Sequence, residues 1–320
     1  MAKRESVTAI IPIRNGAKYL PDFIPNILHT CDEQDEILFI EDHSTDETRE
    51  ILKNYSSRFR NIKVIYAEKE GLVNALNQGI KEASHDWLAR FDCDDKYVDT
   101  RIDLQTALID KNVVCIFSDY RIRGSEGHDL GLIPSPVDPL PTKISLVSNL
   151  RTPHPVAMLR KETVLQVGGY RESDFPAEDL SLWLRLSEVG DLVTVPQELL
   201  TYFLQKNSIT ANRYAESKKK AHSLYLASGR NIQDITSAIS KFEIQRSKYK
   251  HLSLSRERAF LHYLDIYFCM QHHGFKRSDQ ILFLVRNFHL EYLPPIYFLG
   301  KEARKRRRYR RFNQAKNFST

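Results

Sequence analysis

The chain has 320 residues, of which 42% are hydrophobic and 28% charged; this supports a large folded core and excludes a disordered or fibrous chain. Its four cysteines are scattered, without the spacing of a zinc site or a disulfide framework, which favours a reducing cytosol. The formal net charge of +6 is a property of the tail, because residues 301–320 hold nine Lys or Arg and one acid and residues 1–300 sum to −2.

Strands and helices are predicted to alternate over the first 120 residues. Apolar runs predict strands at 7–13, 36–40, 62–66, 87–92 and 113–117. Helical spacing predicts helices at 19–29, 44–55, 71–84 and 98–111. Ser44 and Glu47 have the spacing of a capping box that opens the second helix. This alternation indicates an α/β fold with a mostly parallel sheet, flanked by helices that make right-handed crossovers.

The second part of the chain is less regular. Residues 124–141 are rich in Gly, Pro, Ser and Asp and predict a loop or a β-excursion. Further on, we expect a strand at 156–160, helices at 161–167 and from Asp179, and closing strands at 192–195 and 199–204. From about Ala211 the pattern is mostly helical. We therefore predict three parts: an α/β domain over 1–210, a helical region over 211–300 and a basic tail over 301–320.

An acidic turn follows the strand that ends near Asp92. Asp92, Asp94 and Asp95 are close in sequence, and their charges would repel one another unless something neutralised them. A hard divalent cation, Mn²⁺ or Mg²⁺, takes carboxylate oxygens together with substrate phosphates. The alternative is a solvated turn in which an Asp caps the next helix, and for Asp95 this helix cap is slightly favoured.

Other polar residues are predicted to meet this acidic turn. Arg14 and Asp42 also follow predicted strands. In open α/β sheets, ligands bind at the carboxyl ends of the strands, where such residues converge. Polar residues arriving there from separate strands indicate a binding site more strongly than any one short motif does.

These segments, in this order, resemble the family 2 glycosyltransferases, the inverting nucleotide-sugar enzymes of the GT-A fold. The resemblance covers about residues 6–210. The matching segments are Ile10–Gly16 for the opening strand and turn, Ile40–Thr48 for the acidic "DDGSTDxT" segment, Ala75–Ile80 for the "ARNxG" helix, Phe91–Asp95 for the metal motif, and Val167–Tyr170 with Glu178–Asp179 for the acceptor half.

The resemblance implies roles for the donor and metal residues. Asp94 is the first choice of metal ligand and Asp92 the second, unless Asp92 binds the ribose or a metal-bound water instead. Asp42 is implied to accept a hydrogen bond from the uracil N3–H of a UDP-sugar, and its alternative is a helix N-terminal charge. The donor-binding residues implied are Pro12, Arg14, Asn15, Asp42, Asn77 and Asp92.

The resemblance also implies the residues that act on the acceptor. Asp179 is implied to be the general base, with Glu178 beside it orienting the acceptor. Trp183, one helical turn further on, would form an apolar wall for a sugar ring. The alternatives are first-turn helix charge for the two acids and core packing, which is favoured, for Trp183. His154 and residues 206–208 resemble positions that close over the diphosphate.

The sequence also departs from the family pattern. Arg14 replaces a frequent aromatic residue, which leaves the nucleotide base open, although a planar guanidinium can stack or reach a phosphate. Glu41 replaces the usual first Asp, and His43 replaces a Gly, which predicts a different turn. The Gln-x-x-Arg-Trp pattern of processive synthases does not follow Asp179. We therefore expect transfer of a single sugar to a glycan or lipid-linked acceptor in bacterial surface polysaccharide or glycolipid assembly.

The basic tail has several interpretations. The run 301–311 fits a solvated tail or an anchor on an anionic membrane about equally, and nucleic-acid binding is less favoured. The start of the chain shows no apolar signal segment, and the apolar stretch 281–299 is interrupted by charges and prolines. The expected location is the cytoplasm or the inner face of its membrane. A nucleotidyltransferase and a catalytically idle scaffold of a polysaccharide-assembly complex remain the alternative functions.

Overall fold

The structure is a computed structural model that describes residues 4–124, 127–133, 135, 154–205 and 212–227. Residues 1–135 and 152–204 form one compact unit, and residues 136–151 with 205–320 form another. Of the second unit, the structure describes mainly helix α9 (Tyr214–Ala227). The domain boundary predicted near 211 falls beside undescribed residues and stays a prediction. The predicted helical region beyond 227 and the tail lie outside the described residues.

The first four strands of the sheet are parallel, as predicted. Their order in the sheet is β3-β2-β1-β4, and every residue of β1, β2 and β4 is buried. Long apolar runs thus formed central strands covered on both faces. The bounds are β1 (Val7–Ile13), β2 (Glu36–Glu41), β3 (Ile62–Tyr66) and β4 (Trp87–Arg90).

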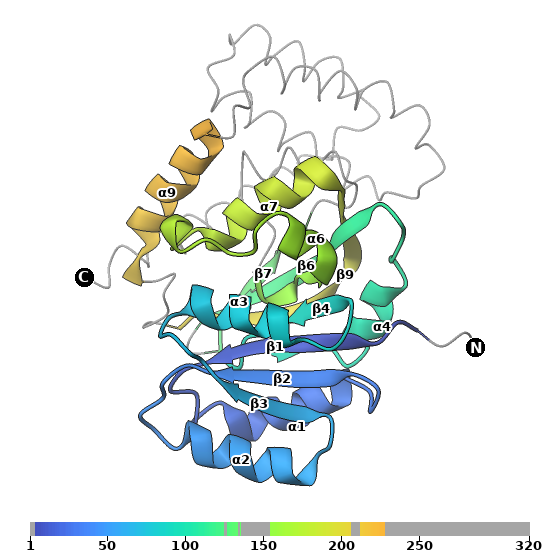
Figure 1. Cartoon of the computed structure of the whole chain (residues 1–320), viewed down its shortest axis with the longest axis vertical. Helices are drawn as coiled ribbons and strands as arrows, with labels where there is room; N and C mark the ends of the chain where they lie inside the picture. The colour runs from blue at the N-terminus through green and yellow to red at the C-terminus, as the bar shows by residue number, and fades with distance from the viewer. Residues whose placement is uncertain (1–3, 125–126, 134, 136–153, 206–211, 228–320) are drawn as a thin grey trace, which may run out of the picture. The chain divides into compact units, whose positions relative to one another are not determined.

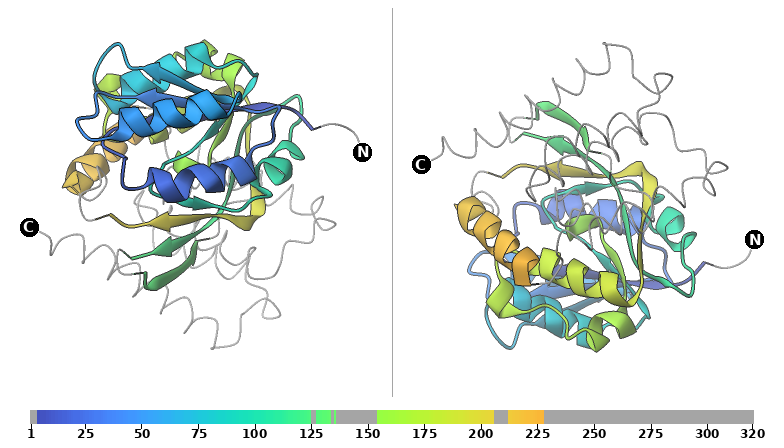
Figure 2. Two further views of the ribbon diagram at one scale, coloured as in Figure 1. Left: turned by 90° about the horizontal axis from the view of Figure 1, so that it is seen from below. Right: turned by 90° about the horizontal axis from the view of Figure 1, so that it is seen from above.

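Helices cover both faces of this half of the sheet. They are α1 (Leu20–Thr30), α2 (Thr48–Arg58) and α3 (Leu72–Glu82). Figure 2 shows α1 and α2 in front of the strands in one view. The opposite view has α7 (Glu178–Val189) in front, which packs against β6 and β9 of the other half of the sheet. Gly79 lets α3 approach β1 and β2 closely, because a Cβ there would lie 2.7 Å from Cδ1 of Ile40.

The second half of the sheet is mixed (Figure 1). Strand β8 lies antiparallel between β4 and β6, β9 runs parallel to β6, and β5 is antiparallel to β9. The segment predicted as a loop or β-excursion contains β7, which pairs with β6. The bounds are β5 (Lys96–Tyr97), α4 (Arg101–Thr106), β6 (Val113–Arg123), β7 (Asp129–Ile133), β8 (Met158–Arg160), α6 (Lys161–Gln166), β9 (Asp191–Phe203) and the 3-10 turns His154–Val156 and Glu172–Asp174.

Three local predictions were wrong. Helix α2 begins after Glu47 without a side-chain cap, and Ser44 Oγ instead accepts a hydrogen bond from the backbone of Asn15 at 2.9 Å. The helix predicted over 98–111 forms only as α4. The two predicted closing strands are one strand, β9, whose pairing with β6 shifts register between Val195 and Glu198. Long-range partners overrode the local pattern in each case.

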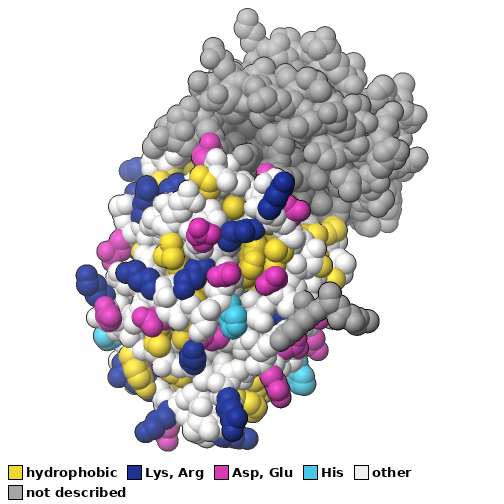
Figure 3. Space-filling view, turned by 45° about the vertical axis from the view of Figure 1, so that its right-hand side comes forward, with side chains coloured by type: hydrophobic (Ala, Val, Ile, Leu, Met, Phe, Trp, Pro, Cys, Tyr) yellow, Lys and Arg dark blue, Asp and Glu magenta, His cyan; other side chains and the backbone are white. Residues whose placement is uncertain are grey.

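The described surface carries mixed charge. On the face in Figure 3, Lys and Arg side chains alternate with Asp and Glu. This agrees with the sequence, in which the excess positive charge belongs to residues 301–320. Among the residues the structure describes, no helix has the length and apolar character required to cross a membrane.

Arg101 is a fully buried cation that joins several elements behind the site. Its exposed fraction is 0%, and it donates to the backbone oxygens of Arg90 at 2.8 Å and Pro155 at 3.2 Å. Its guanidinium lies 4.0 Å from the ring centre of Phe91. Burial lowers the pKa of Arg101 to about 10, so the group stays charged at neutral pH.

We expect Arg101→Met to lower the free energy of unfolding by about 3 kcal/mol, because two buried carbonyl oxygens lose their donor. The melting temperature should fall by about 6–12 °C. Thermal unfolding checks this, with Arg58→Met on the exposed end of α2 as the matched control. Equal melting temperatures for the two variants would contradict the assignment.

Candidate active site

The polar residues that follow separate strands meet at one edge of the sheet. Because β1, β2 and β4 are parallel, their carboxyl ends lie side by side. The chain after β2 is tied to β1 by a hydrogen bond from Asp42 N to Ile13 O at 2.8 Å. Phe91 N, after β4, donates to Ile10 O of β1 at 3.1 Å. The predicted convergence of Arg14, Asp42 and the acidic turn is therefore confirmed at the level of the backbone.

The acidic turn forms a cluster of three carboxylates. Asp92, Asp94 and Asp95 each offer a carboxylate oxygen, and these oxygens lie within 4.8 Å of one another. Burial, and then the charge of Asp92, raises the pKa of Asp94 to about 6. Burial and the charges of its two neighbours also raise the pKa of Asp95. The three groups repel one another in a partly dry site and favour a bound cation.

Asp95 does not cap a helix, contrary to the favoured alternative. Its Oδ1 accepts a hydrogen bond from the backbone of Phe203 in β9 at 2.9 Å, and α4 begins only at Arg101. Its Oδ2 is buried without a partner in the described structure. A buried carboxylate oxygen without a donor fits a divalent cation, which prefers oxygen ligands. The residues present therefore fit Mn²⁺ or Mg²⁺, with Asp94 and Asp92 as predicted ligands.

A buried arginine lies beside this cluster. The side chain of Arg90 is 4% exposed and its Nη2 donates to Oδ1 of Asp92 at 2.7 Å. Arg90 was not among the residues predicted from the sequence, although a charged residue inside an otherwise apolar strand that ends in acids is a signal of a functional site. Arg90 is the last residue of β4, directly before the acidic turn.

Two more carboxylates approach from helix α7. Glu178 and Asp179 form its first turn, as predicted. Burial, and then the charge of Asp179, raises the pKa of Glu178 to about 7, while Arg90 lowers it and Asp92 raises it further. Burial also raises the pKa of Asp179, against hydrogen bonds to its carboxylate and the charge of Arg90. The charge of Arg90 thus acts on both carboxyl groups, and the charge of Asp92 acts on Glu178.

Aromatic side chains pack around Trp183 of helix α7. Nε2 of His154 lies 2.8 Å from the hydroxyl of Tyr170, and Trp183 packs edge-on against His154 and Phe117, with ring centres 5.9 and 5.2 Å apart. Trp183 is 0% exposed. A sugar cannot stack on a fully buried ring, so we correct its acceptor-binding assignment to the core-packing alternative.

The nucleotide side is held by contacts between loops. Both carboxylate oxygens of Asp42 accept the backbone N–H of Gly71 at 3.1 Å. Arg14 is half-exposed and forms an ion pair with Glu70. Asn15 N donates to Ser44, and Asn15 Oδ1 accepts from the backbone of Thr45 at 2.8 Å. Asp42 is 5% exposed and Arg14 half-exposed, and both follow the carboxyl ends of their strands.

Two further residues of this region are described by their backbone positions, Pro12 in the predicted strand and His43 in the turn after β2. Pro12 is buried within β1, opposite Ile40 of β2. His43 has a φ of 54°, so it adopts the left-handed turn that a Gly would favour, and the prediction of a different turn was wrong.

Asn77 is occupied within the protein. Its Nδ2 donates to Tyr170 O at 2.8 Å and its Oδ1 accepts from Tyr170 N at 2.9 Å. Gly169, with a φ of 62°, makes this contact possible, because a Cβ there would lie 2.6 Å from Asn77 Oδ1. Asn77 therefore links α3 to the segment before α7. These hydrogen bonds account for its position without the predicted contact with the donor. Residues 206–208 lie outside the described residues.

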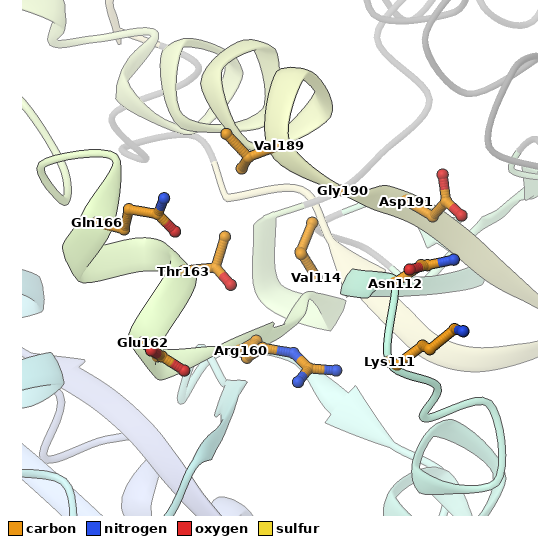
Figure 4. Close-up of a pocket in the computed structure, with 10 residues that line it drawn as sticks. All are labelled: Lys111, Asn112, Val114, Arg160, Glu162, Thr163, Gln166, Val189, Gly190 and Asp191. Atoms are coloured by element: carbon orange, nitrogen blue, oxygen red, sulfur yellow. The ribbon is translucent and has the colours of Figure 1, made fainter.

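A shallow depression elsewhere has none of these features. It is lined by Lys111, Arg160 and Asp191 among others, at the end of the sheet where β6 and β9 begin (Figure 4). It therefore lies at the opposite ends of the strands from the acidic cluster. Its lining residues serve below as controls.

A mixed sheet with a carboxylate cluster at a strand end and an acidic pair at the start of α7 is the arrangement expected of a glycosyltransferase of the GT-A type. Residues 8–165 match the model of the family described as "Glycosyl transferase family 2". These residues form a domain of this family, and the chain is a glycosyltransferase enzyme. The nucleotidyltransferase and idle-scaffold alternatives are therefore set aside.

Named relatives agree with this assignment. A Bacillus subtilis protein named as a teichuronic acid biosynthesis glycosyltransferase, TuaG, is 27% identical over 217 residues, covering 67% of this chain and 84% of its own length. An uncharacterized glycosyltransferase of Rickettsia conorii is 29% identical over 58% of this chain, but the match spans 32% of that longer protein.

Solved structures share the fold. A mannosyltransferase from Pyrobaculum calidifontis, solved in complex with GDP-Man and Mn²⁺, is 14% identical, covers 99% of this chain and 86% of its own, and has a TM-score of 0.60. S. aureus TarS with UDP-GlcNAc is 14% identical, covers 82% of this chain and 81% of its own, and has a TM-score of 0.54. These likenesses confirm the predicted GT-A fold.

Proposed function

We propose that the protein moves a single sugar, with inversion, from a UDP-sugar to a hydroxyl of a glycan or lipid-linked acceptor during assembly of a bacterial cell-surface polysaccharide. One observation carries the proposal. Arg90, the last residue of β4, forms an ion pair with Asp92 of the carboxylate cluster, and its charge also acts on Glu178 and Asp179 at the start of α7. The relative named for teichuronic acid biosynthesis supports the polysaccharide class.

The donor is proposed to lie along the open edge of the sheet. Asp42 has two carboxylate oxygens that accept one backbone N–H, so acceptor capacity is left for the N3–H of uracil. Arg14 beside it is positioned to stack on the base or contact a phosphate. TarS binds UDP-GlcNAc and the mannosyltransferase binds GDP-Man, so the base preference is the point that an experiment must decide.

The site residues divide the reaction between them. Asp94 and Asp92 would hold Mn²⁺ or Mg²⁺, which when bound neutralises the charge that develops on the leaving diphosphate. Asp179 accepts the proton of the acceptor hydroxyl as its oxygen attacks the anomeric carbon. The bond from that carbon to the diphosphate oxygen breaks in the same displacement, and the bonding electrons leave with the diphosphate. Glu178 would orient the acceptor.

Calorimetric titration of UDP, GDP and deoxythymidine diphosphate, with and without Mn²⁺, tests the donor class. We expect tight binding of UDP that requires the metal. Preference for another nucleotide would keep the transferase but remove the uracil role from Asp42. Binding of none of them, in protein that is folded by circular dichroism, would overturn the proposal.

We further propose that the enzyme works at the inner face of the cytoplasmic membrane, held by the basic run 301–311. Each Lys or Arg near an anionic surface contributes about 1 kcal/mol, and residues 301–320 hold nine of them. Removing 301–320 should weaken sedimentation with anionic vesicles by at least about 10-fold and leave turnover on a soluble acceptor unchanged. Vesicles of neutral lipid are the control, and persistent binding to anionic vesicles would exclude the tail as the anchor.

A further inference from the structure

Arg90 holds one oxygen of a predicted metal ligand. Its Nη2 donates to Asp92 Oδ1 at 2.7 Å and its Nη1 donates to the backbone oxygen of Phe91. Both acceptors belong to the turn that carries the carboxylate cluster, so one planar group fixes the backbone and a side chain of that turn together. Among the described residues, Oδ2 of Asp92 has no hydrogen-bond donor and remains free to bind a cation.

Arg90 is itself held rigidly. Its side chain is 4% exposed, and its backbone is fixed from both sides, because Arg90 N donates to Ala157 O at 2.8 Å and Arg90 O accepts from the buried Arg101 at 2.8 Å. Its Nε has no partner in the described structure. A buried guanidinium is costly to desolvate, so this placement calls for a role that a smaller or apolar residue would not fill.

The groups that face Arg90 come from both halves of the site. From the acidic turn these are Asp92, Asp94 and Asp95; from helix α7 they are Glu178 and Asp179; and from the remaining packed elements they are Tyr97, Arg101, His154 and Tyr170. Five of these groups are carboxylates. The charge of Arg90 therefore acts on carboxylates of both the proposed donor side and the proposed acceptor side.

We propose that Arg90 is a positioning residue of the metal site, which orients Asp92 so that Oδ2 is available to the cation. The proposal rests on the proposed function, because it assumes that the carboxylate cluster binds Mn²⁺ or Mg²⁺. The planar fork is the feature that matters: a lysine carries the same charge but cannot reproduce the two donor directions of a guanidinium.

The test is Arg90→Lys in the full chain, with Mn²⁺ binding measured by calorimetry and by the electron paramagnetic resonance signal of free Mn²⁺. Lysine keeps the positive charge, so the electrostatic repulsion between this side chain and Mn²⁺ is unchanged. Only the paired donor directions of the planar guanidinium are lost. We expect Mn²⁺ affinity, alone and with UDP, to fall by about 10–100-fold, as when a partner that orients a metal ligand is removed. Arg160→Lys is the matched control, since Arg160 also donates to backbone oxygens, of Val113 and Asp110, at the opposite ends of the strands.

Each outcome decides the question. Failure of the unaltered protein to bind Mn²⁺ or UDP would overturn the proposed function and this inference together. Normal or tighter Mn²⁺ binding by a folded Arg90→Lys variant would overturn the inference alone. If Arg90→Lys does not fold, Arg90→Gln is measured in its place, and if neither variant folds, Arg90 serves folding and the inference is overturned.

Discussion

Asp179→Asn is expected to lower kcat by about 10²–10⁴-fold, the usual contribution of a positioned general base. The amide is nearly the same size as the carboxylate but cannot accept the proton of the acceptor hydroxyl. Nucleotide and Mn²⁺ affinity should be unchanged, since Asp179 lies on α7 and the proposed donor contacts lie on the loops after β1, β2 and β4. Single-turnover transfer and calorimetry on the same preparation measure the two effects separately.

Two variants make this prediction specific. Asp191→Asn is the matched control, because Asp191 begins β9 at the depression away from the site. Glu178→Gln should mainly raise the KM for the acceptor, because Glu178 is proposed to orient it. If Glu178→Gln abolishes turnover while Asp179→Asn does not, the base is Glu178.

The same pair predicts the pH dependence. The pKa of Glu178 is raised to about 7 and that of Asp179 is raised as well, so both carboxyls hold their protons at a higher pH than the ordinary value of about 4. A protonated base is inactive. We therefore expect kcat/KM to fall as pH decreases, with an apparent pKa near 7 that belongs to the coupled pair. An acid limb near pH 4 would contradict this.

Asp94→Asn is expected to remove metal-dependent UDP binding. The loss should exceed the roughly 10–100-fold caused by removing a residue that only orients a ligand, because here a charged oxygen ligand itself is lost. Binding of UDP without metal should be similar in variant and unaltered protein, and so should the melting temperature. Calorimetry with and without Mn²⁺ measures the difference.

Asp86→Asn is the matched control for Asp94, since Asp86 is exposed and precedes β4 at its opposite end. Metal-dependent UDP binding by Asp94→Asn at the level of this control would remove Asp94 from the site. In that case Asp95, with its unpartnered buried oxygen, would be the next ligand to test.

The sequence by itself determined the parallel half of the fold and where its site lies. Strands β1 and β3 begin and end at the predicted residues, because both are short runs rich in the β-branched and apolar residues that favour strands. Since parallel strands end at one edge, the meeting of Arg14, Asp42 and the acidic turn also followed from the sequence. The lengths and the order of the predicted strands and helices were sufficient to predict this convergence.

Only the tertiary structure decided which groups act on one another. The ion pair of Arg90 with Asp92 and the bond of Asp95 to Phe203 are set by packing, and Asn77 finds its partner in Tyr170, 93 positions away. The same holds for the errors: Ser44 bonds to Asn15 instead of capping a helix, and Trp183 is buried. A side chain's partner depends on which distant segment packs against it, and local sequence patterns carry little information about that choice.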